Sequence, residues 1–479
     1  MENSSHGITP RRFVRNSLLL ISVEFVAKGL GVVFFAMVAR FLGAKEVGLY
    51  AFSLALANFF IIPAKFGFEP IIQREVGRDP GNTYRYFWGI VTVKMLISVI
   101  SWSVFLLILV VFFKQDFTVM VLAGGFTFMY SFMEFTNTFF RANQRPELEL
   151  MVRTCFSIGN LGLGALVLYA GWRLPGVLVI QLICAVVAVA MGVLTLVHIC
   201  TKVRLSWNRQ VLRGYVVSAA PFAAILVALY LSNQIGIIIL TPLSGTEDVG
   251  YFAAAARLFD NLTLIPAAIM GVFLPVMSGF YIKSVGSFVR TLRFTVKYMF
   301  ILALPLIVVC GLLAHPIVIF LYREAFSPSA AALQILSLVL VFSFWNYTSE
   351  SVLIARNRER TLLMLTWMTA GVNIIANLIL IPLFSYLGAC IAILTTQVIY
   401  AIILFLLQMR RYLSLAKLVQ ILARPVLCAL ISAVVIVMMR HQHLFVSIAT
   451  GLVVYTVTLI AMGAVKQSEV NIFHGYIKK

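Results

Sequence analysis

The amino-acid sequence predicts an all-α protein that crosses a lipid bilayer about fourteen times. Three observations support this fold class: an apolar composition, a series of apolar runs long enough to span hydrocarbon, and basic clusters that recur in alternate connections. Of the 479 residues, 62% are hydrophobic and only 11% are charged, which is more apolar side chain than a water-soluble core can bury. The chain is therefore expected to lie in a membrane.

The apolar runs are the predicted membrane-spanning helices. A helix needs ~20 apolar residues to cross ~30 Å of hydrocarbon, and fourteen runs meet or approach this length. They cover residues 17–39, 47–66, 86–113, 117–140, 152–171, 175–200, 214–241, 249–275, 294–320, 329–352, 362–383, 386–408, 422–439 and 444–465. The first run is too long for the apolar part of a signal peptide and contains Glu24 and Lys28, so we expect it to be retained.

Basic residues gather in every second connection. They precede the first run and then follow every even-numbered run, and together these clusters hold most of the 37 Lys and Arg. Because basic connections stay on the cytoplasmic side, we predict a multi-pass protein of the inner or plasma membrane with both termini in the cytoplasm. The net charge of +20 then reflects topology, and nucleic-acid binding is not expected. The six cysteines show no CxxC spacing, so neither a disulfide framework nor a metal site is indicated.

Two segments of the first half recur in the second. EVGLYAFSLALANFFIIPA at 46–64 resembles DVGYFAAAARLFDNLTLIPA at 248–267, with an offset of 202 to 203. SFMEFTNTFFRANQR, from Ser131, resembles SFWNYTSESVLIARNR, from Ser343, with an offset of 212 to 213. The offsets correspond to six helices, an even number, so both copies cross the membrane in the same direction.

This duplication predicts the domain organisation. We expect two parallel-related six-helix lobes with a polar path and a central cavity at the seam between them. The N-lobe would comprise 1–205 and the C-lobe 206–410, while 411–479 would hold two further helices and a cytoplasmic tail.

The predicted connections are too short to hold a catalytic domain. The longest cytoplasmic ones, 67–85 and 276–293, have fewer than twenty residues, and neither a Walker motif nor HExxH occurs. We therefore expect a protein that is not an enzyme and that needs no cofactor.

Ionisable residues inside apolar runs are costly, so each is a candidate functional residue. Lys28 and Arg257 are predicted to lie near the middle of the membrane, and each shares a helix face with a carboxylate, Glu24 and Asp260 respectively. Two interpretations remain open. In one, each pair neutralises itself and holds the lobes together. In the other, Lys28 and Arg257 line the seam and attract an anionic substrate, while Glu24 or Asp260 orients them or binds a coupling cation.

Several other polar residues are candidates for contacts with a substrate. Lys65 and Lys94 are predicted to lie within reach of water, and with Glu134 and Glu350, near the cytoplasmic ends of their helices, they are candidates for an inner mouth. Solvated helix ends would explain the two glutamates equally well. Five asparagines suit either sugar hydroxyls or hydrogen bonds between helices: Asn58, Asn160, Asn261, Asn373 and Asn377.

Four stretches resemble a known family. They are FLGAKEVGLYAFSLALANFF (41–60), DVGYFAAAARLFDNLTLIPAAIMGVFLPVMS (248–278), LYREAFSPSAAALQIL (321–336) and NIIANLILIPLFSYLGACIAILTTQ (373–397). They are similar to the polysaccharide transporter family, the Wzx-type flippases of lipid-linked oligosaccharides such as O-antigen units, over nearly the whole chain. Its superfamily also contains multidrug exporters and lipid II flippases. The resemblance implies two six-helix lobes around a V-shaped cationic cavity, with two extra helices at the C-terminus.

The resemblance also implies a function. It leads us to expect a flippase that moves an undecaprenyl-diphosphate-linked glycan from the cytoplasmic to the outer leaflet by alternating access, driven by an H+ or Na+ gradient or by the membrane potential. Expected partners are membrane lipids and the polymerase and glycosyltransferases of the same pathway. Two departures from the family pattern limit the comparison. SNQIGIIIL (232–240) stands where many relatives have an Arg-Asp pair, so no charged role transfers to Asn233 or Gln234, and Arg323 stands where Gly is common.

Other functions remain as alternatives. Within the same fold these are a cation-coupled multidrug exporter and a lipid II flippase. From other classes they are a membrane glycosyltransferase or ligase, which the short connections disfavour, and a transport-inactive scaffold, which would not require charges inside the membrane.

Overall fold

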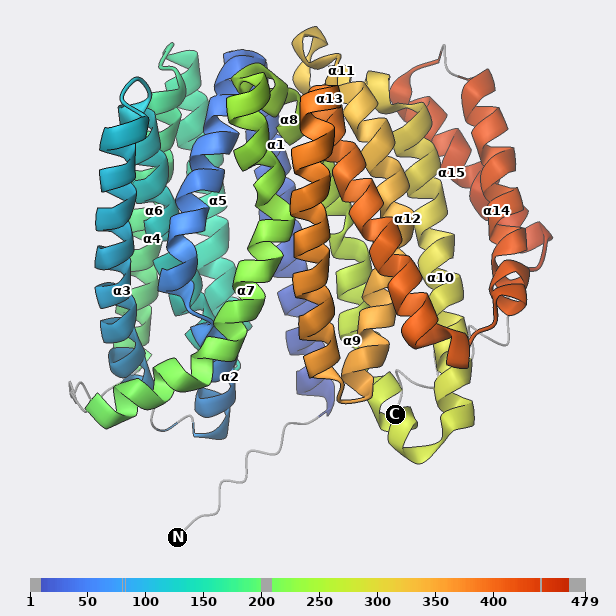
Figure 1. Ribbon diagram of the computed structural model, residues 1–479, viewed down its shortest axis with the longest axis horizontal. Helices are drawn as coiled ribbons and strands as arrows, with labels where there is room; N and C mark the ends of the chain where they lie inside the picture. The colour runs from blue at the N-terminus through green and yellow to red at the C-terminus, as the bar shows by residue number, and fades with distance from the viewer. Residues whose placement is uncertain (1–9, 80, 82, 200–208, 440–441, 465–479) are drawn as a thin grey trace. The chain divides into compact units, whose positions relative to one another are not determined.

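The computed structural model describes residues 10–79, 81, 83–199, 209–439 and 442–464, and the side chains of 10–25, 78, 199, 209–213, 215–218 and 221 lie outside the described part. The described elements are α-helices and short 3-10 turns, which confirms the all-α prediction (Figure 1). By their contacts the residues form two compact units, Met1–Gly250 and Tyr251–Lys479, called unit 1 and unit 2 below.

Unit 1 contains seven helices and the first turn of an eighth. The helices are α1 (Pro10–Lys65), α2 (Phe68–Arg78), α3 (Thr83–Phe112), α4 (Phe117–Ala142), α5 (Pro146–Tyr169), α6 (Leu174–Ile199), α7 (Arg209–Ser244) and the start of α8 (Thr246–Leu262). Helix α4 occupies the centre, since it packs against α1, α2, α3, α5 and α6. Helix α7 packs on α1, α2 and α3, and the Tyr230 hydroxyl donates to the Ala55 carbonyl. These contacts place α7 in unit 1.

Unit 2 continues from α8. Its further helices are α9 (Leu264–Lys283), α10 (Val285–Leu312), α11 (Ala314–Tyr322), α12 (Ser329–Ala355), α13 (Glu359–Leu407), α14 (Leu415–Met438) and α15 (Leu444–Ala461), with 3-10 turns η2 (Glu324–Phe326) and η3 (Met409–Arg411). Helix α12 packs against α9, α10, α11 and α13. Helices α14 and α15 pair with each other and with α10, where the Tyr455 hydroxyl donates to the Ile301 carbonyl over 2.9 Å.

Twelve of the described helical segments are long and apolar enough to cross a membrane. Two of them, Val26–Gly77 with 52 residues and Glu359–Leu407 with 49, are far longer than one crossing requires. Each contains a residue with non-helical backbone, Gly43 (φ 78°, ψ 176°) and Ser385 (φ 50°, ψ −130°). Helices α1 and α13 therefore each consist of two helical arms joined at a sharp break, as the separate apolar runs on either side predict.

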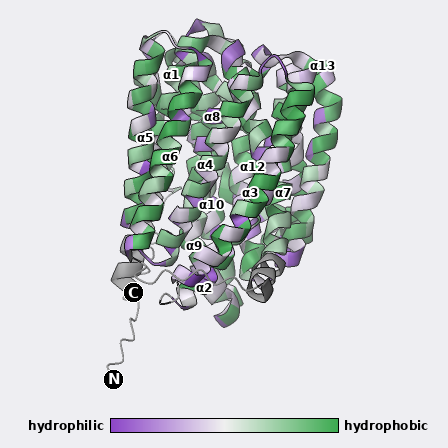
Figure 2. Ribbon diagram, turned by 90° about the vertical axis from the view of Figure 1, so that its left-hand side faces the viewer, coloured by the Kyte–Doolittle hydropathy of each residue, from purple (hydrophilic) through white to green (hydrophobic). Residues whose placement is uncertain are grey.

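Large apolar side chains cover the outside of these helices, as a hydrocarbon solvent requires. Val99, Ile100 and Leu107 of α3 and Leu430 and Val434 of α14 are all exposed. Figure 2 shows the hydrophobic colour along most of the length of the helices. In a water-soluble protein such surfaces would aggregate, so the structure is that of a multi-pass membrane protein.

The two cytoplasmic connections predicted at 67–85 and 276–293 are largely helical. Helix α2 lies in the first of them and buries Phe68, Ile71, Ile72 and Val76 on one face. Eleven residues are too few to span the membrane, so hydropathy alone does not detect this helix. In the second, α9 and α10 are separated only at Ser284, whose hydroxyl accepts from the Ser287 amide as an N-cap.

The internal repeat is visible in the backbone. Three pairs of residues with positive φ recur at offsets of 202, 213 and 214: Gly43 (78°) with Gly245 (86°), Gln144 (57°) with Asn357 (54°), and Gly171 (80°) with Ser385 (50°). Positive φ is uncommon outside glycine, so coincidence is a poor explanation for matched non-glycine positions such as Gln144 and Asn357. The turns as well as the helices were therefore duplicated.

Candidate functional site

The charged pairs predicted near the middle of the membrane lie on α1 and α8. Lys28 is half-buried on α1, whereas the side chain of Glu24 lies outside the described part, so the Glu24–Lys28 pair is not described. Arg257 and Asp260 both expose their side chains from the second half of α8, in the candidate span Thr246–Lys283. Helix α8 ends two residues after Asp260, at Leu262, and the Thr263 hydroxyl donates to the Asp260 carbonyl over 2.9 Å.

Asp260 and a second predicted acidic residue, Glu350, both lie in unit 2. The carboxylates of both residues act electrostatically on the hydroxyl of Tyr347, which lies on α12 one turn before Glu350. Glu350 also accepts a hydrogen bond of 2.9 Å from the hydroxyl of Tyr400 on α13. In the part of the chain that the structure describes, no lysine or arginine forms an ion pair with Glu350. Glu350 therefore has a hydroxyl partner on the neighbouring helix α13.

Arg257 contributes a cation to the same unit. Its charge acts on the hydroxyl of Tyr322 in α11, which itself donates to the Ala254 carbonyl over 3.2 Å. The tyrosines Tyr322, Tyr347 and Tyr400 were not among the predicted site residues. Tyr347 could have been found from the sequence, because it lies three residues before Glu350 on the same predicted helix. Tyr400 could not, because it lies on a different helix and its contact with Glu350 is visible only in the structure.

The acidic residue predicted at the inner mouth of unit 1, Glu134, belongs to an ion network between α4 and α5. Arg153 Nη2 lies 2.7 Å and Arg141 Nη2 lies 3.4 Å from its carboxylate. The same arginines contact Glu149, each with Nε at 3.0 Å. The Glu134 side chain is only 15% exposed, so this end of α4 is a buried, charge-neutral network and not a solvated helix end.

Lys94 lies inside unit 1 and does not reach water. Lys94 is only 2% exposed. Its Nζ donates to the Ala64 carbonyl at 3.2 Å and to the Ser131 hydroxyl at 2.7 Å. Nζ also lies over the rings of Phe132 and Phe135, 4.9 and 5.6 Å from their centroids. Helix α1 ends directly after Ala64, where the last carbonyls of a helix have no donor within it, so a lysine is well placed to satisfy one of them.

The break that Lys94 stabilises also involves Lys65. Lys65 is the last residue of α1 and is half-buried, and Phe66 and Gly67 follow it with φ of 39° and 67° before α2 begins. Two consecutive residues with positive φ turn the chain sharply. The lysines predicted for the inner mouth therefore lie at an elbow between a membrane-spanning helix and a short amphipathic one.

The five asparagines differ in their surroundings. Asn58 and Asn261 each donate to a carbonyl one turn earlier on their own helix, Leu54 and Arg257. Asn373, Asn377 and Thr396 form a buried cluster within α13, with Asn373 donating to the Thr396 hydroxyl and Asn377 to the Asn373 side chain. Asn160 is also buried. The cluster in α13 fits the interpretation as hydrogen bonds between helices, because it joins the two arms on either side of Ser385.

A ladder of polar contacts joins α12 to α13 and was not predicted. Asn346 donates to the Gln397 side chain over 2.6 Å, and Gln408 donates to the Ser349 carbonyl over 2.7 Å. Tyr400, which donates to Glu350, lies between Gln397 and Gln408 in sequence. Within the described ranges, no three His, Cys, Asp or Glu side chains come together as metal ligands.

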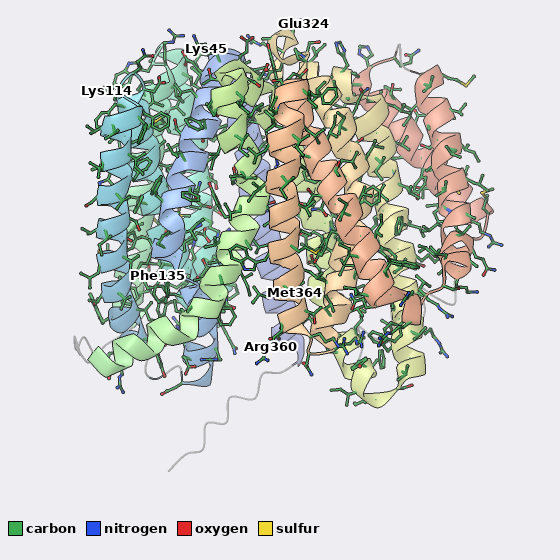
Figure 3. The ribbon with its side chains drawn as sticks, viewed as in Figure 1. Lys45, Lys114, Phe135, Glu324, Arg360 and Met364 are labelled. Atoms are coloured by element: carbon green, nitrogen blue, oxygen red, sulfur yellow. The ribbon has the colours of Figure 1, made fainter. Side chains whose placement is uncertain are left out.

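Labelled side chains indicate the two ends of each unit. In unit 1, Lys45 and Lys114 lie toward one end of the helices and Phe135 toward the other (Figure 3). In unit 2, Glu324 lies at one end and Arg360 and Met364 toward the other (Figure 3). This agrees with the charge pattern, which assigns Lys45 and Lys114 to the same side of the membrane.

The fold is that of a polytopic membrane protein. Residues 13–280 match the family described as "Polysaccharide biosynthesis protein", which is more than half of the chain. The chain belongs to this family. No curated protein matches it.

Solved structures show the same architecture. The chain is similar to the lipid II flippase MurJ in an inward closed conformation, with a TM-score of 0.69, 15% identity and coverage of 92% of this chain and 98% of that one. It is also similar to an inward-facing multidrug resistance transporter of the MATE family, with a TM-score of 0.66, 16% identity and coverage of 83% and 98%. A transporter of the superfamily from Pyrococcus furiosus gives a TM-score of 0.57 at 16% identity, with coverage of 84% and 96%. At these identities the likeness establishes the fold alone.

Proposed function

We propose that the protein is a flippase that moves an undecaprenyl-diphosphate-linked oligosaccharide from the cytoplasmic to the outer leaflet by alternating access. The observation that carries the proposal is the exposed side chain of Arg257 within a candidate membrane span, in a chain of the polysaccharide biosynthesis family. A cation at this depth requires water or an anionic group, and a diphosphate supplies the latter.

The physical need for such a protein is clear. Each sugar hydroxyl costs several kcal/mol to move into hydrocarbon without a hydrogen-bonding partner, so an oligosaccharide does not cross unaided. A polar path removes that cost while the prenyl chain remains in lipid. A diphosphate that moves outward across an inside-negative membrane also gains roughly 2.3 kcal/mol per charge per 100 mV. The membrane potential, or an H+ or Na+ gradient, can therefore drive the step without ATP.

The proposed architecture follows the sequence repeat. If the two divided helices each cross twice, the twelve candidate spans become fourteen crossings with both termini in the cytoplasm. Helices of 1–205 and 206–410 form the two lobes, and 411–479 adds the last two helices. Glycosyltransferases and a polymerase of the same pathway would supply and consume the substrate.

The proposed residue roles assign cations to the diphosphate and amides to the sugars. Lys28 and Arg257 hold the diphosphate, and Glu24 and Asp260 orient these cations or carry the coupling ion. Asp260 lies in unit 2, where its carboxylate can take up a coupling proton or cation. Asn58 and Asn261 would contact the glycan, and Lys65 and Glu350 would form the inner mouth. The buried residues Asn160, Asn373, Asn377, Lys94 and Glu134 would hold the helices around the path.

The test compares two arginines in the same reconstituted system. Arg257→Ala is expected to reduce the translocation of a fluorescent prenyl-diphosphate oligosaccharide in liposomes by at least about tenfold, since loss of a charged contact costs about 1.5–3 kcal/mol. Arg290→Ala, which removes an exposed arginine near the start of α10, is the control and should translocate normally. Arg257→Ala protein that folds and flips like the parent would contradict the assigned role.

A second candidate is a cation-coupled exporter of small amphipathic compounds. The similarity of the fold to MATE transporters and the presence of two carboxylates in unit 2, Asp260 and Glu350, favour it. It predicts transport of a cationic dye in the same liposomes. The lipid II flippase alternative is tested in the same liposomes with a third substrate, the prenyl-diphosphate carrier that bears a peptide-containing head group.

A further inference from the structure

Within unit 1, helix α1 and the first turn of α8 cross with backbone against backbone. A Cβ atom built on Gly48 would lie 1.6 Å from the carbonyl oxygen of Thr246 and 2.8 Å from the amide nitrogen of Gly250. A Cβ atom built on Gly250 would lie 2.0 Å from the carbonyl oxygen of Ala44. The neighbouring atoms all belong to the backbone, so no change of rotamer can make room. Only glycine permits this approach, and it does so at both positions.

The contact is reciprocal because its residues are repeat mates. Gly48 corresponds to Gly250 and Ala44 to Thr246, both at the offset of 202. Each glycine contacts the residue that precedes its mate by four positions, which is one helical turn. The four residues are therefore related as by a local twofold axis between the two helices. The flanking mates Val47 and Val249 are both fully buried.

Both helices enter the crossing from a glycine elbow. Gly43 and Gly245, again mates at the offset of 202, have φ of 78° and 86° and precede the crossing glycines by five residues. Residues with such backbone conformations at the ends of elements are the positions at which helices change direction. The duplicated unit thus contains both a close contact and a hinge next to it.

We propose that this glycine crossing, Ala44, Gly48, Thr246 and Gly250, is the outer closure of the transport path. Helices α1 and α8 touch here when the outer side is closed and separate here when it opens. Packing between glycines depends on close approach, and no side chain has to be withdrawn when the helices part. Lys45, next to Ala44, lies in a connection that the charge pattern assigns to the outer side. The inference depends on the transporter class and not on which substrate is carried.

The first test measures access from outside. Ala55→Cys places a thiol two turns beyond Gly48 on the same face of α1, at a residue that is 2% exposed. It should react slowly with an impermeant thiol reagent, above the background of the native cysteines. Adding Gly48→Ala or Gly250→Ala should raise its labelling rate about tenfold, because the new methyl group separates the helices. Gly162→Ala, at a helical glycine of α5 with no atom within 4 Å of the added Cβ, is the control and should change nothing.

The double variant distinguishes closure from general destabilisation. One separation of α1 from α8 makes room for both methyl groups, so Gly48→Ala with Gly250→Ala should label about as fast as the faster single variant. Independent local damage would instead multiply the two effects. Unchanged labelling in both single variants, or a multiplicative double variant, would overturn the proposal.

A second measurement applies if the alanine variants do not fold. Cysteines at Ala44 and Thr246, joined by a short bifunctional thiol reagent, should hold the outer side closed. The cross-linked protein should lose translocation of the prenyl-diphosphate oligosaccharide and recover it on cleavage of the linker. Normal translocation while cross-linked would contradict the closure. A parent protein that does not move this lipid would instead count against the proposed function, and the labelling of Ala55→Cys would still decide the closure.

Discussion

Lys94 shows how one residue can combine an unfavourable location with a structural role. Removal of a lysine from water is costly, and here two hydrogen bonds and two aromatic rings offset that cost. Lys94 lies on α3, and its Nζ contacts both the last turn of α1 and Ser131 of α4. It therefore links α3 and α4 to the elbow before α2. Sequence position alone suggested a side chain that reaches water, because the four-carbon stem is long enough to do so.

Replacement of this lysine should expose its structural contribution. Lys94→Met leaves the Ala64 carbonyl without its donor, and a buried unsatisfied acceptor costs ~1–3 kcal/mol. The thermal unfolding temperature in detergent is therefore expected to fall. Lys94→Gln keeps a donor and should lose less. An unchanged or higher unfolding temperature for Lys94→Met would show that the lysine is retained for another reason.

The ion network at Glu134 permits a sharper comparison. Arg153→Ala removes contacts to both Glu134 and Glu149, and breaking a buried ion pair on one side costs ~3–5 kcal/mol. Arg141 still contacts both carboxylates, so the loss should lie toward the lower end of this range. The matched control is Arg145→Ala, an exposed arginine in the adjacent turn. Chemical denaturation of the two variants should separate them clearly, and equal stability would mean that Arg141 compensates fully.

Among the elements, the breaks within the long helices α1 and α13 determine how the chain changes direction. Gly43 has φ 78° and ψ 176°, a conformation that a Cβ atom disfavours by ~1–3 kcal/mol. Gly43→Ala should therefore destabilise the protein. Gly29→Ala, in the helical part of the same α1 with no neighbour within 4 Å, should stabilise it slightly through helix propensity. Thermal unfolding of both variants tests the break, and the same sign of change in both would contradict it.

The contact between α12 and α13 offers a second test at this scale. Tyr400→Phe removes the one hydroxyl that donates to Glu350, and hydrogen bonds to charged groups contribute ~1.5–3 kcal/mol. A loss of stability of this size is expected by denaturant titration if Glu350 is ionised. Combination with Glu350→Gln should then reduce the effect. If Tyr400→Phe loses as much stability in the Glu350→Gln background as in the parent, Tyr400 stabilises the protein by packing and not through this hydrogen bond.

The helices could be predicted from the sequence where an apolar run marks a membrane span or a glycine marks a break. The breaks at Gly43 and Ser385 separate apolar runs that the sequence already showed as distinct, whereas the matched turns at corresponding positions of the repeat were not predicted. Helix α2 was missed because an amphipathic helix of eleven residues has no span-length signal. The partners of Glu134, Glu350 and Lys94 were missed for another reason, since each partner set includes residues of a second helix and depends on packing.

For the whole molecule, the fold is that of a multi-pass membrane protein of the polysaccharide biosynthesis family, and the repeat suggests how it is built. Two units with corresponding turns and a pair of corresponding glycines indicate that the duplicated segment contains both the helices and their hinges. The charges differ between the copies, because Glu134 forms an ion network where Asn346 occupies the matching position. A duplicated scaffold with different polar residues in each half suits a substrate whose two ends differ, as a diphosphate and a glycan do.

The most direct test of this account is translocation by the purified parent protein. A fluorescent prenyl-diphosphate oligosaccharide is placed in one leaflet of liposomes, an impermeant quencher reports its arrival in the other, and a cationic dye is tested in parallel under an imposed potential. We predict protein-dependent movement of the glycan lipid, faster when the potential draws the diphosphate across, with no movement of the dye. Movement of the dye but not of the glycan lipid would contradict the flippase and establish an exporter.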